Sequence, residues 1–262
     1  LDAWEVDSPD GPLQFSGGTD EMIAAGIYYV ADLVPTLDGP VVINMSLGGP
    51  EPSAMIEAAV DYAIEQGVIV VASAGNEGMD GMGYPGGVEQ IISAGAIGWA
   101  EMFGIGYGWT GDVPEKLNKK DSLGNTRPVY LEDFSSRPNK DLDQKHQDLD
   151  VSAPGAWVVG PYKSDFANIT GYFYLSGTSM AAPHVSAMAA LVLQNYNDVG
   201  QAEMEFILQK AAEGNPLPAS DAIVLFPFEE PYYYTAMWDG GDYGSGFLQA
   251  DQALNAAGKF VK

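Results

Sequence analysis

The stretch YLSGTSMAAPHVSAMAAL, residues 174–191, decides how the rest of this chain can fold. Its alanine-rich part predicts a helix that opens at Ser179 and runs to about Tyr196. Pro183 falls near the first turn, where the missing N–H of proline costs little. Ser179 therefore lies at the positive end of a helix dipole, beside backbone N–H groups without partners in the helix. This environment suits a nucleophile whose attack creates an oxyanion.

Three further motifs precede this stretch, and a fourth follows it. The motifs are VVINMSLGGP (41–50), VVASAGNEG (70–78) with GYPG (83–86), FSS (134–136) with DLDVSAPG (148–155), and YGSGFLQADQAL (243–254). Together with GTSMAAPHVSAMAAL (177–191), they resemble the ordered motifs of the subtilisin-like serine proteases, the subtilases. The resemblance covers most of the chain from about Gly17 onward.

Periodicity predicts the main elements of the fold. Residues 20–33 carry apolar side chains at helical spacing, and Pro35 stops that helix. Residues 41–45 and 68–72 are β-branched runs typical of buried parallel strands, and residues 53–67 between them predict a helix. Such a strand–helix–strand unit implies a right-handed crossover. We therefore predict an α/β fold with a mainly parallel sheet and helices on both faces.

We expect the whole chain, residues 1–262, to form one domain, because no linker or internal repeat divides it. Two segments depart from the pattern of strands and helices. Residues 99–131 are rich in glycine, aromatic and charged residues, and residues 213–240 are rich in proline and tyrosine. We interpret both as insertions relative to the subtilase core. With 46% apolar residues, the chain is large enough to bury a full core.

Composition excludes several classes of partner. The chain carries 36 Asp and Glu residues against 11 Lys and Arg, a formal charge of −25. Such a charge repels nucleic acid and anionic membrane surfaces, so we predict no nucleic-acid partner. No run of 18 uncharged apolar residues occurs, so we expect no membrane span. The absence of cysteine excludes disulfides and thiolate chemistry.

The nucleophile needs a base that this chain does not supply. A serine hydroxyl reacts well only when a base removes its proton, and the resemblance implies a histidine oriented by an aspartate. Only two histidines are present. His184 lies five residues after Ser179 and projects to another side of the predicted helix, so we expect it to pack or hydrogen-bond. His146 lies in a charged loop, downstream of the place that family order demands, so we assign it no catalytic role.

The aspartate segment and the HGT-type histidine segment of subtilases have no counterpart in residues 1–262. The first strands of the family's sheet are missing too, so the chain resembles the C-terminal two-thirds of a subtilase catalytic domain. An unpaired apolar sheet edge is unfavourable. We therefore expect the fold to be incomplete without an N-terminal fragment or second chain, which docks here and supplies both residues. A degenerate family member is the alternative.

Asn76 is the second candidate catalytic residue. It follows a predicted buried strand, at the carboxyl end where parallel sheets place their sites. Its side-chain amide can donate to the developing oxyanion together with the backbone N–H of Ser179, as the subtilase resemblance implies. Without the motifs around it, the same residue would be read as part of an Asn-Glu-Gly turn.

The resemblance also implies residues that bind a polypeptide substrate. Main-chain pairing supplies affinity in such a groove, and pockets supply preference. One side is formed by the strand Ser46-Leu47-Gly48, and the other by Gly17 and Gly18. Gly75 and Gly83 would line an open first pocket with a broad preference for large apolar or aromatic residues. If the resemblance misleads, these glycines merely mark turns.

Metal binding has two readings. The chemistry requires no cofactor. Asp141, Asp143, Asp148 and Asp150 lie in one loop, with Asp239 and Asp242 in another. Oxygen clusters bind calcium, and many subtilases hold calcium for stability, so a structural calcium ion is a candidate. No EF-hand spacing occurs, and we interpret these loops as solvated acidic surface. No metal ligand is therefore assigned.

The sequence thus predicts a serine endopeptidase that hydrolyses peptide bonds. The resemblance also implies a secreted protein with an extracellular or cell-surface location. Two alternatives remain open. One is a catalytically inactive subtilase-like protein that binds peptides without cutting them. The other is a structural or surface-layer subunit whose tyrosine-rich insertions make lateral contacts.

Overall fold

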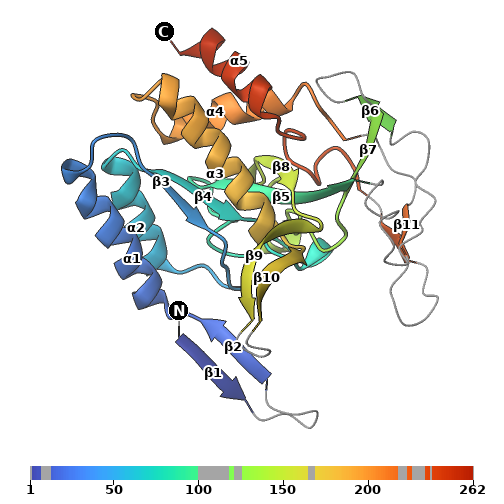
Figure 1. Ribbon diagram of the computed structural model, residues 1–262, viewed down its shortest axis with the longest axis horizontal. Helices are drawn as coiled ribbons and strands as arrows, with labels where there is room; N and C mark the ends of the chain where they lie inside the picture. Colours follow the sequence, from blue (N-terminus) through green and yellow to red (C-terminus); the bar gives the residue numbers. More distant parts are fainter. Residues whose placement is uncertain are drawn as a thin grey trace.

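The computed structural model describes residues 2–6, 13–99, 118–120, 126–164, 169–217, 223–225, 234–236 and 238–261. A six-stranded sheet forms its centre (Figure 1). The strands along it are β3 (Val42–Met45), β4 (Ile69–Ser73), β5 (Ile92–Trp99), β7 (Thr126–Leu131) and β6 (Asn118–Lys120), and β8 (Val151–Pro154) also pairs with β5.

The predicted mainly parallel sheet is confirmed. β3, β4, β5 and β8 pair in parallel, whereas β7 runs antiparallel to the end of β5 and to β6. β7 belongs to the segment 99–131 that we interpreted as an insertion. Its residues Val129, Tyr130 and Leu131 are buried, so the end of that segment is part of the core.

Helices cover both faces of the sheet, as predicted. On one face lie α1 (Asp20–Leu33) and α2 (Ala54–Glu65); on the other lie α3 (Thr178–Asn195), α4 (Gln201–Ala212) and α5 (Ala250–Phe260) (Figure 1). β4 shows why both faces are buried. Because successive side chains of a strand point to opposite faces, Val70 and Ala72 pack toward α1 and α2, whereas Ile69 and Val71 pack toward α3 and α4.

The helix boundaries follow local signals. Ser53 caps α2, because its hydroxyl accepts a hydrogen bond from Ile56 N–H. Thr19 caps α1 in the same way. Within the described segments, short 3-10 helices add turns at Val34–Thr36, Gly78–Asp80, Lys140–Leu142 and His146–Asp148. Among the described residues, no helix combines the length and the apolar character that crossing a membrane requires.

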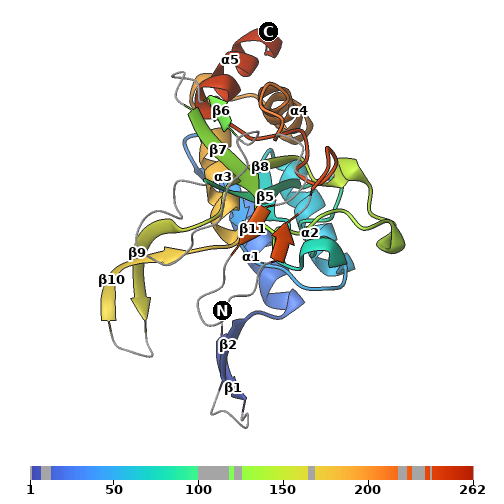
Figure 2. The same cartoon turned by 90° about the vertical axis from the view of Figure 1, so that its right-hand side faces the viewer.

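The described strands also form three antiparallel hairpins outside the central sheet. They are β1 (Asp2–Val6) with β2 (Leu13–Gly17), β9 (Val158–Ser164) with β10 (Ile169–Leu175), and β11 (Ile223–Leu225) with β12 (Tyr234–Ala236). Figure 2 shows the first two projecting away from the sheet. The third falls in the segment 213–240. β10 leads directly into the start of α3, so the second hairpin adjoins the nucleophile segment.

A buried carboxyl group lies just before β8. Asp150 is 3% exposed, and its two oxygens accept hydrogen bonds from Ser93 N–H at 2.7 Å and from the Gln209 side-chain amide at 2.7 Å. Burial raises the pKa of Asp150 to about 7 against the opposing hydrogen bonds from Ser93, and the charge of Glu205 adds to the rise. The charged form of this group therefore opposes folding near neutral pH.

This carboxyl makes stability depend on pH. A pKa raised on folding contributes stability below the ordinary value of about 4, and that stability is lost as the pH rises toward and through 7. Asp150→Asn should therefore raise the free energy of unfolding at pH 8 relative to pH 5 by up to about 2.7 kcal/mol, compared with the unchanged protein. Urea unfolding at both pH values measures it. The exposed control Asp38→Asn should show no such difference, and an equal effect of Asp150→Asn at both pH values would contradict the assignment.

Candidate active site

The first turn of α3 presents Ser179. The predicted helix is confirmed over Thr178–Asn195, and Ser179 is its second residue. Pro183 has no N–H to donate, so the carbonyl oxygen of Ser179 lacks its helical partner. The hydroxyl of Ser46 donates to that oxygen instead, at 2.7 Å. The helix start is thereby fastened to the segment that follows β3.

Asn76 is held in one orientation beside the same helix start. It lies in the loop after β4, and its Oδ1 accepts hydrogen bonds from Thr178 N–H at 2.9 Å and Thr178 Oγ1 at 3.0 Å. Because a backbone N–H can only donate, these bonds fix which amide atom is the oxygen. The Nδ2 group therefore faces away from Thr178, and it donates to no other residue in the described part of the chain.

Gly75 makes this loop possible. Its φ is 109°, a conformation that L side chains rarely adopt. A Cβ at this position would lie 2.5 Å from Glu77 Oε2 and 2.8 Å from Ser136 Oγ. The space that glycine leaves is used by a small network, in which Glu77 Oε2 accepts from Asn76 N–H at 2.6 Å and from Ser136 Oγ at 3.0 Å.

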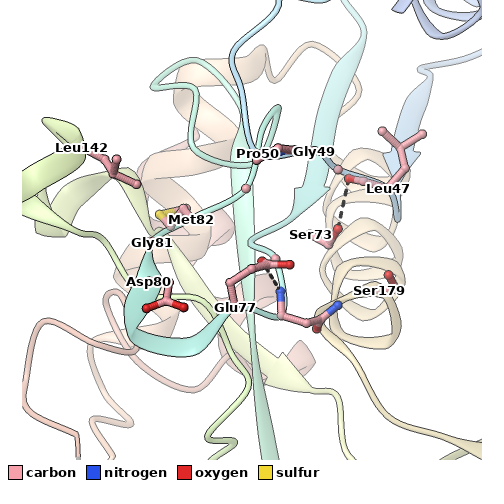
Figure 3. Close-up of a pocket in the computed structure, with 14 residues that line it drawn as sticks. Leu47, Gly49, Pro50, Ser73, Glu77, Asp80, Gly81, Met82, Leu142 and Ser179 are labelled. Atoms are coloured by element: carbon pink, nitrogen blue, oxygen red, sulfur yellow. Dashed lines mark hydrogen bonds between the residues drawn. The ribbon is translucent and has the colours of Figure 1, made fainter. Parts of the chain in front are cut away.

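A cavity of about 360 Å³ brings the candidate residues together (Figure 3). Ser179, Asn76, Leu47, Gly48, Gly75 and Gly83 all line it, as do Gly49, Pro50, Ser73, Glu77, Asp80, Gly81, Met82 and Leu142. Two walls of the cavity are linked, because Gly49 and Tyr84 exchange two backbone hydrogen bonds of 2.8 Å. Ser46 does not line the cavity. It is linked to a residue that does, because its hydroxyl donates a hydrogen bond to the carbonyl oxygen of Ser179.

Gly17 and Gly18 lie apart from this cavity. Gly17 ends β2 and pairs with Asp2, whereas Gly18 lines two neighbouring cavities. One of these, about 120 Å³, shares Leu47 and Gly48 with the Ser179 cavity. Leu47 and Gly48 therefore form a wall between two adjoining pockets, which is the arrangement that a groove for an extended chain requires.

Neither histidine faces the Ser179 hydroxyl. His184 Nδ1 lies 2.8 Å from Met180 O on its own helix, which agrees with the predicted hydrogen-bonding role. His146 packs against Gly241, where an added Cβ would lie 2.0 Å from the ring. Neither residue is among the described residues that line the cavity. Within the described part of the chain, Ser179 thus has no histidine base.

The acidic loops singled out in the sequence form no acidic cluster within the described part of the chain. Among the described residues, no three acidic or histidine side chains form a group that could hold an ion. Asp150 is buried against Ser93 and Gln209, and Asp148 accepts a hydrogen bond from Lys145 N–H. The structural calcium ion therefore stays a prediction, and no step of the chemistry is assigned to a metal.

Sequence reasoning did not single out several residues at this site, among them Thr178, Asp80 and Leu142. Thr178 orients Asn76, and its place inside the GTS motif was the available signal. Asp80 and Leu142 line the cavity but belong to loops without a motif, and these loops meet only in the folded chain.

Comparison with known proteins gives a consistent result. A model of the subtilase family matches residues 8–230. A subtilisin from Bacillus sp. (strain TA39) is 32% identical over 251 residues, which are 94% of this chain and 49% of that protein. Subtilisin DY from Bacillus licheniformis is 33% identical over 205 residues, 76% of this chain and 58% of that protein. The chain therefore spans about half the length of these curated relatives.

Solved structures agree with the family match. The S41 psychrophilic protease superimposes with a TM-score of 0.64 at 29% identity, covering 90% of this chain and 65% of that one. Sphericase gives a TM-score of 0.63 at 28% identity, covering 89% and 64%. The superpositions agree with an α/β fold that has a mainly parallel sheet.

Proposed function

The chain belongs to the subtilase family, and on this premise we propose that it is the nucleophile-bearing part of a serine endopeptidase. One observation carries the proposal. Thr178 holds Asn76 Oδ1, so that Asn76, through its oppositely directed Nδ2 group, and Ser179 line the same cavity. A nucleophile and an oriented amide donor at one helix start are the two groups that acyl transfer requires.

The chemistry follows from these positions. Ser179 Oγ attacks the carbonyl carbon of a peptide bond, and the carbonyl oxygen becomes negatively charged. Asn76 Nδ2 and the backbone N–H of Ser179 donate hydrogen bonds to that oxygen. The amide carries no charge, so its contribution is greatest where charge develops and small in the ground state.

A base must take the Ser179 proton, and we propose that another polypeptide segment supplies it. The described residues place no histidine at the cavity. The segment would carry the histidine and the aspartate that orients it. It is either a second chain or an N-terminal fragment.

The open edge of the sheet is the surface on which this segment would dock. β3 pairs with β4 on one side and with no described strand on the other. An apolar groove of about 270 Å³ runs beside that edge, lined by Gly18, Met22, Ile23, Gly26, Ile27, Val30, Ile43, Met45 and Leu47. A strand added in parallel would bury this surface and satisfy the free backbone groups of β3.

The direction of such a strand fits the chemistry. Parallel strands end on the same side of a sheet, and β3 leads to Ser46, which binds the Ser179 carbonyl. A strand added at this edge would therefore deliver the residues after its carboxyl end to the region of Ser179. We propose this segment as the source of the missing base.

One observation supports a second candidate function. Because the described residues give Ser179 no base, the chain could hold peptides in its groove without cutting them. Under both functions the ligand is a polypeptide. For the protein's location we propose the extracellular space or the cell surface, as the subtilase resemblance implies.

Activity with and without the missing segment separates these functions. Residues 1–262 purified alone should hydrolyse no fluorogenic peptide, because Ser179 keeps its proton. The protein isolated from its natural source should hydrolyse peptides and, by mass spectrometry, should contain an HGT-type histidine segment. Turnover by residues 1–262 alone that disappears in His146→Ala would contradict the proposal. A sample that contains the segment and binds peptides but cuts none would favour the binding function.

A further inference from the structure

Arg137 is a buried cation beside the loop that follows β4. Only 4% of the residue is exposed. Within the described part of the chain, its buried Nε and Nη2 groups donate to no hydrogen-bond acceptor. A buried N–H group without an acceptor costs free energy, and the cost is larger for a charged group. The guanidinium group therefore lacks hydrogen bonds that its burial requires.

The carboxylates around Arg137 do not supply these bonds. Burial lowers the pKa of Arg137, and the charges of Asp242, Asp133 and Asp239 oppose that shift, so all three lie near the guanidinium group. Asp239 Oδ1 accepts a hydrogen bond from Gly241 N–H at 2.8 Å, and Asp242 Oδ2 accepts one from Asp239 N–H at 2.9 Å. These two carboxylates fix their own turn. Their attraction favours the charged guanidinium group but leaves its Nε and Nη2 groups without an acceptor.

Among the described residues, the Arg137 side chain donates only to the sulfur of Met79. The donor is Nη1, and the distance to Met79 Sδ is 2.8 Å. A thioether sulfur is a weak acceptor. The backbone of Arg137 holds the same loop, because its N–H donates to Gly78 O at 2.9 Å. Arg137 thus contacts the 3-10 helix Gly78–Asp80, just after Asn76, through one ordinary hydrogen bond and one weak one.

Met79 connects this buried cation to solvent. Its exposed fraction is 66%, against 44% for Met22 and 46% for Met55. A hydroperoxide in solution can therefore reach its side chain. The sulfur lone pair attacks one peroxide oxygen, so that an S–O bond forms and the O–O bond breaks. Sulfur loses two electrons; with hydrogen peroxide, the proton on the attacked oxygen passes to the departing hydroxide, which leaves as water.

A sulfoxide at this position would supply the acceptor that Arg137 lacks. Its oxygen is bonded directly to the sulfur that already contacts Nη1. A sulfoxide oxygen is a far stronger acceptor than a thioether sulfur, and hydrogen bonds from a charged donor are among the strongest in proteins. Methionine oxidation usually disrupts apolar packing. Here the sulfur faces a cation, so the same oxidation should stabilise the contact.

We propose that Met79 is an oxidation site whose sulfoxide is bound by Arg137. Oxidation by a hydroperoxide then strengthens the attachment of the loop that carries Asn76. The inference goes beyond the proposed peptidase function and does not depend on it, because protein stability and peptide mass are measured without a substrate. Failure of the peptidase function would leave the Met79–Arg137 pair open to the same tests.

Glutamine mimics the oxidised side chain, because its Cδ takes the place of the methionine sulfur and carries a carbonyl oxygen. Met79→Gln should raise the Tm of the assembled protein by about 4 °C relative to Met79→Leu, as one hydrogen bond to a charged group would do in a chain of this size. Amide hydrogen exchange of residues 76–80 should also be slower in Met79→Gln. Both gains should disappear in an Arg137→Met background, which has no donor.

Met55 provides the matched control for these variants. It is an exposed methionine on α2, and no described residue donates a hydrogen bond to its sulfur. Met55→Gln should therefore show no such gain over Met55→Leu. The proposal is overturned if Met79→Gln shows neither gain over Met79→Leu, or if the gain persists in the Arg137→Met background.

Oxidation itself provides a second test, which leaves Arg137 in place. The assembled protein and its Met79→Leu variant are treated with dilute hydrogen peroxide, and peptide mass spectrometry measures the sulfoxide at each methionine. Oxidation of the other methionines lowers the Tm of both proteins, so the difference between them isolates Met79. The protein with Met79 should lose about 4 °C less than the variant. An equal or larger loss, with no slower exchange of residues 76–80, would overturn the proposal.

Discussion

Replacing Ser179 by alanine should abolish peptide hydrolysis by the assembled enzyme, with a loss in kcat of roughly 10⁶-fold, the scale known for loss of the nucleophile in subtilisin. The physical reason is that, among the described residues, Ser179 carries the only hydroxyl of α3 that lines the cavity. Ser73 lines it from β4, and the Thr178 hydroxyl is occupied by hydrogen bonds to Gly75 O and Asn76 Oδ1. Peptide binding should persist, because the walls of the cavity come from Leu47, Gly48 and their neighbours. Steady-state kinetics and anisotropy of a labelled peptide measure the two quantities.

A matched control is available three residues earlier. Ser176 is exposed, and its Oγ accepts a hydrogen bond from Trp157 N–H at 2.8 Å. Ser176→Ala should keep most of the activity. Substantial hydrolysis by the Ser179→Ala enzyme would mean that another residue is the nucleophile and that the role assigned to Ser179 is wrong.

The Asn76→Leu variant should lower kcat by roughly 10²–10³-fold with little change in KM, because the lost hydrogen bond forms mainly in the transition state. Leucine has a similar size but cannot donate. Asn76→Asp should be no better, since one oxygen can still accept from Thr178 while the other presents an acceptor to the developing charge.

A distant asparagine controls for the loss of an amide. Asn195, at the end of α3, bonds only to Leu191 O of its own helix among the described residues, so Asn195→Leu should leave kcat unchanged. A fall in kcat of less than about threefold for Asn76→Leu would show that Asn76 is only a turn residue.

Much of the fold could be predicted because its signals are local. The β-branched runs that became β3 and β4, the cap at Ser53 and the alanine-rich helix from Thr178 each depend on nearby residues. Ser179 and Asn76 could be proposed for a similar reason, since each sits in a distinctive motif at the end of a predicted element.

The rest depends on contacts between distant segments. Asp150 looked like one member of a solvated acidic loop, but the start of β8 places it beneath Ser93 and Gln209, where it is buried. The place of Asp80 was equally hidden. Asp80 is only one of 36 acidic residues until the loop that carries it meets the Ser179 cavity.

Active-site labelling tests the central claim most directly, namely that Ser179 is the nucleophile of an enzyme completed by another segment. A fluorophosphonate probe is applied to the assembled protein and to residues 1–262 alone, and the labelled residue is identified by peptide mass spectrometry. The predicted result is a label on Ser179 in the assembled protein and little or none in the chain alone. A label on a different serine, or equal labelling of Ser179 in both samples, would contradict the claim.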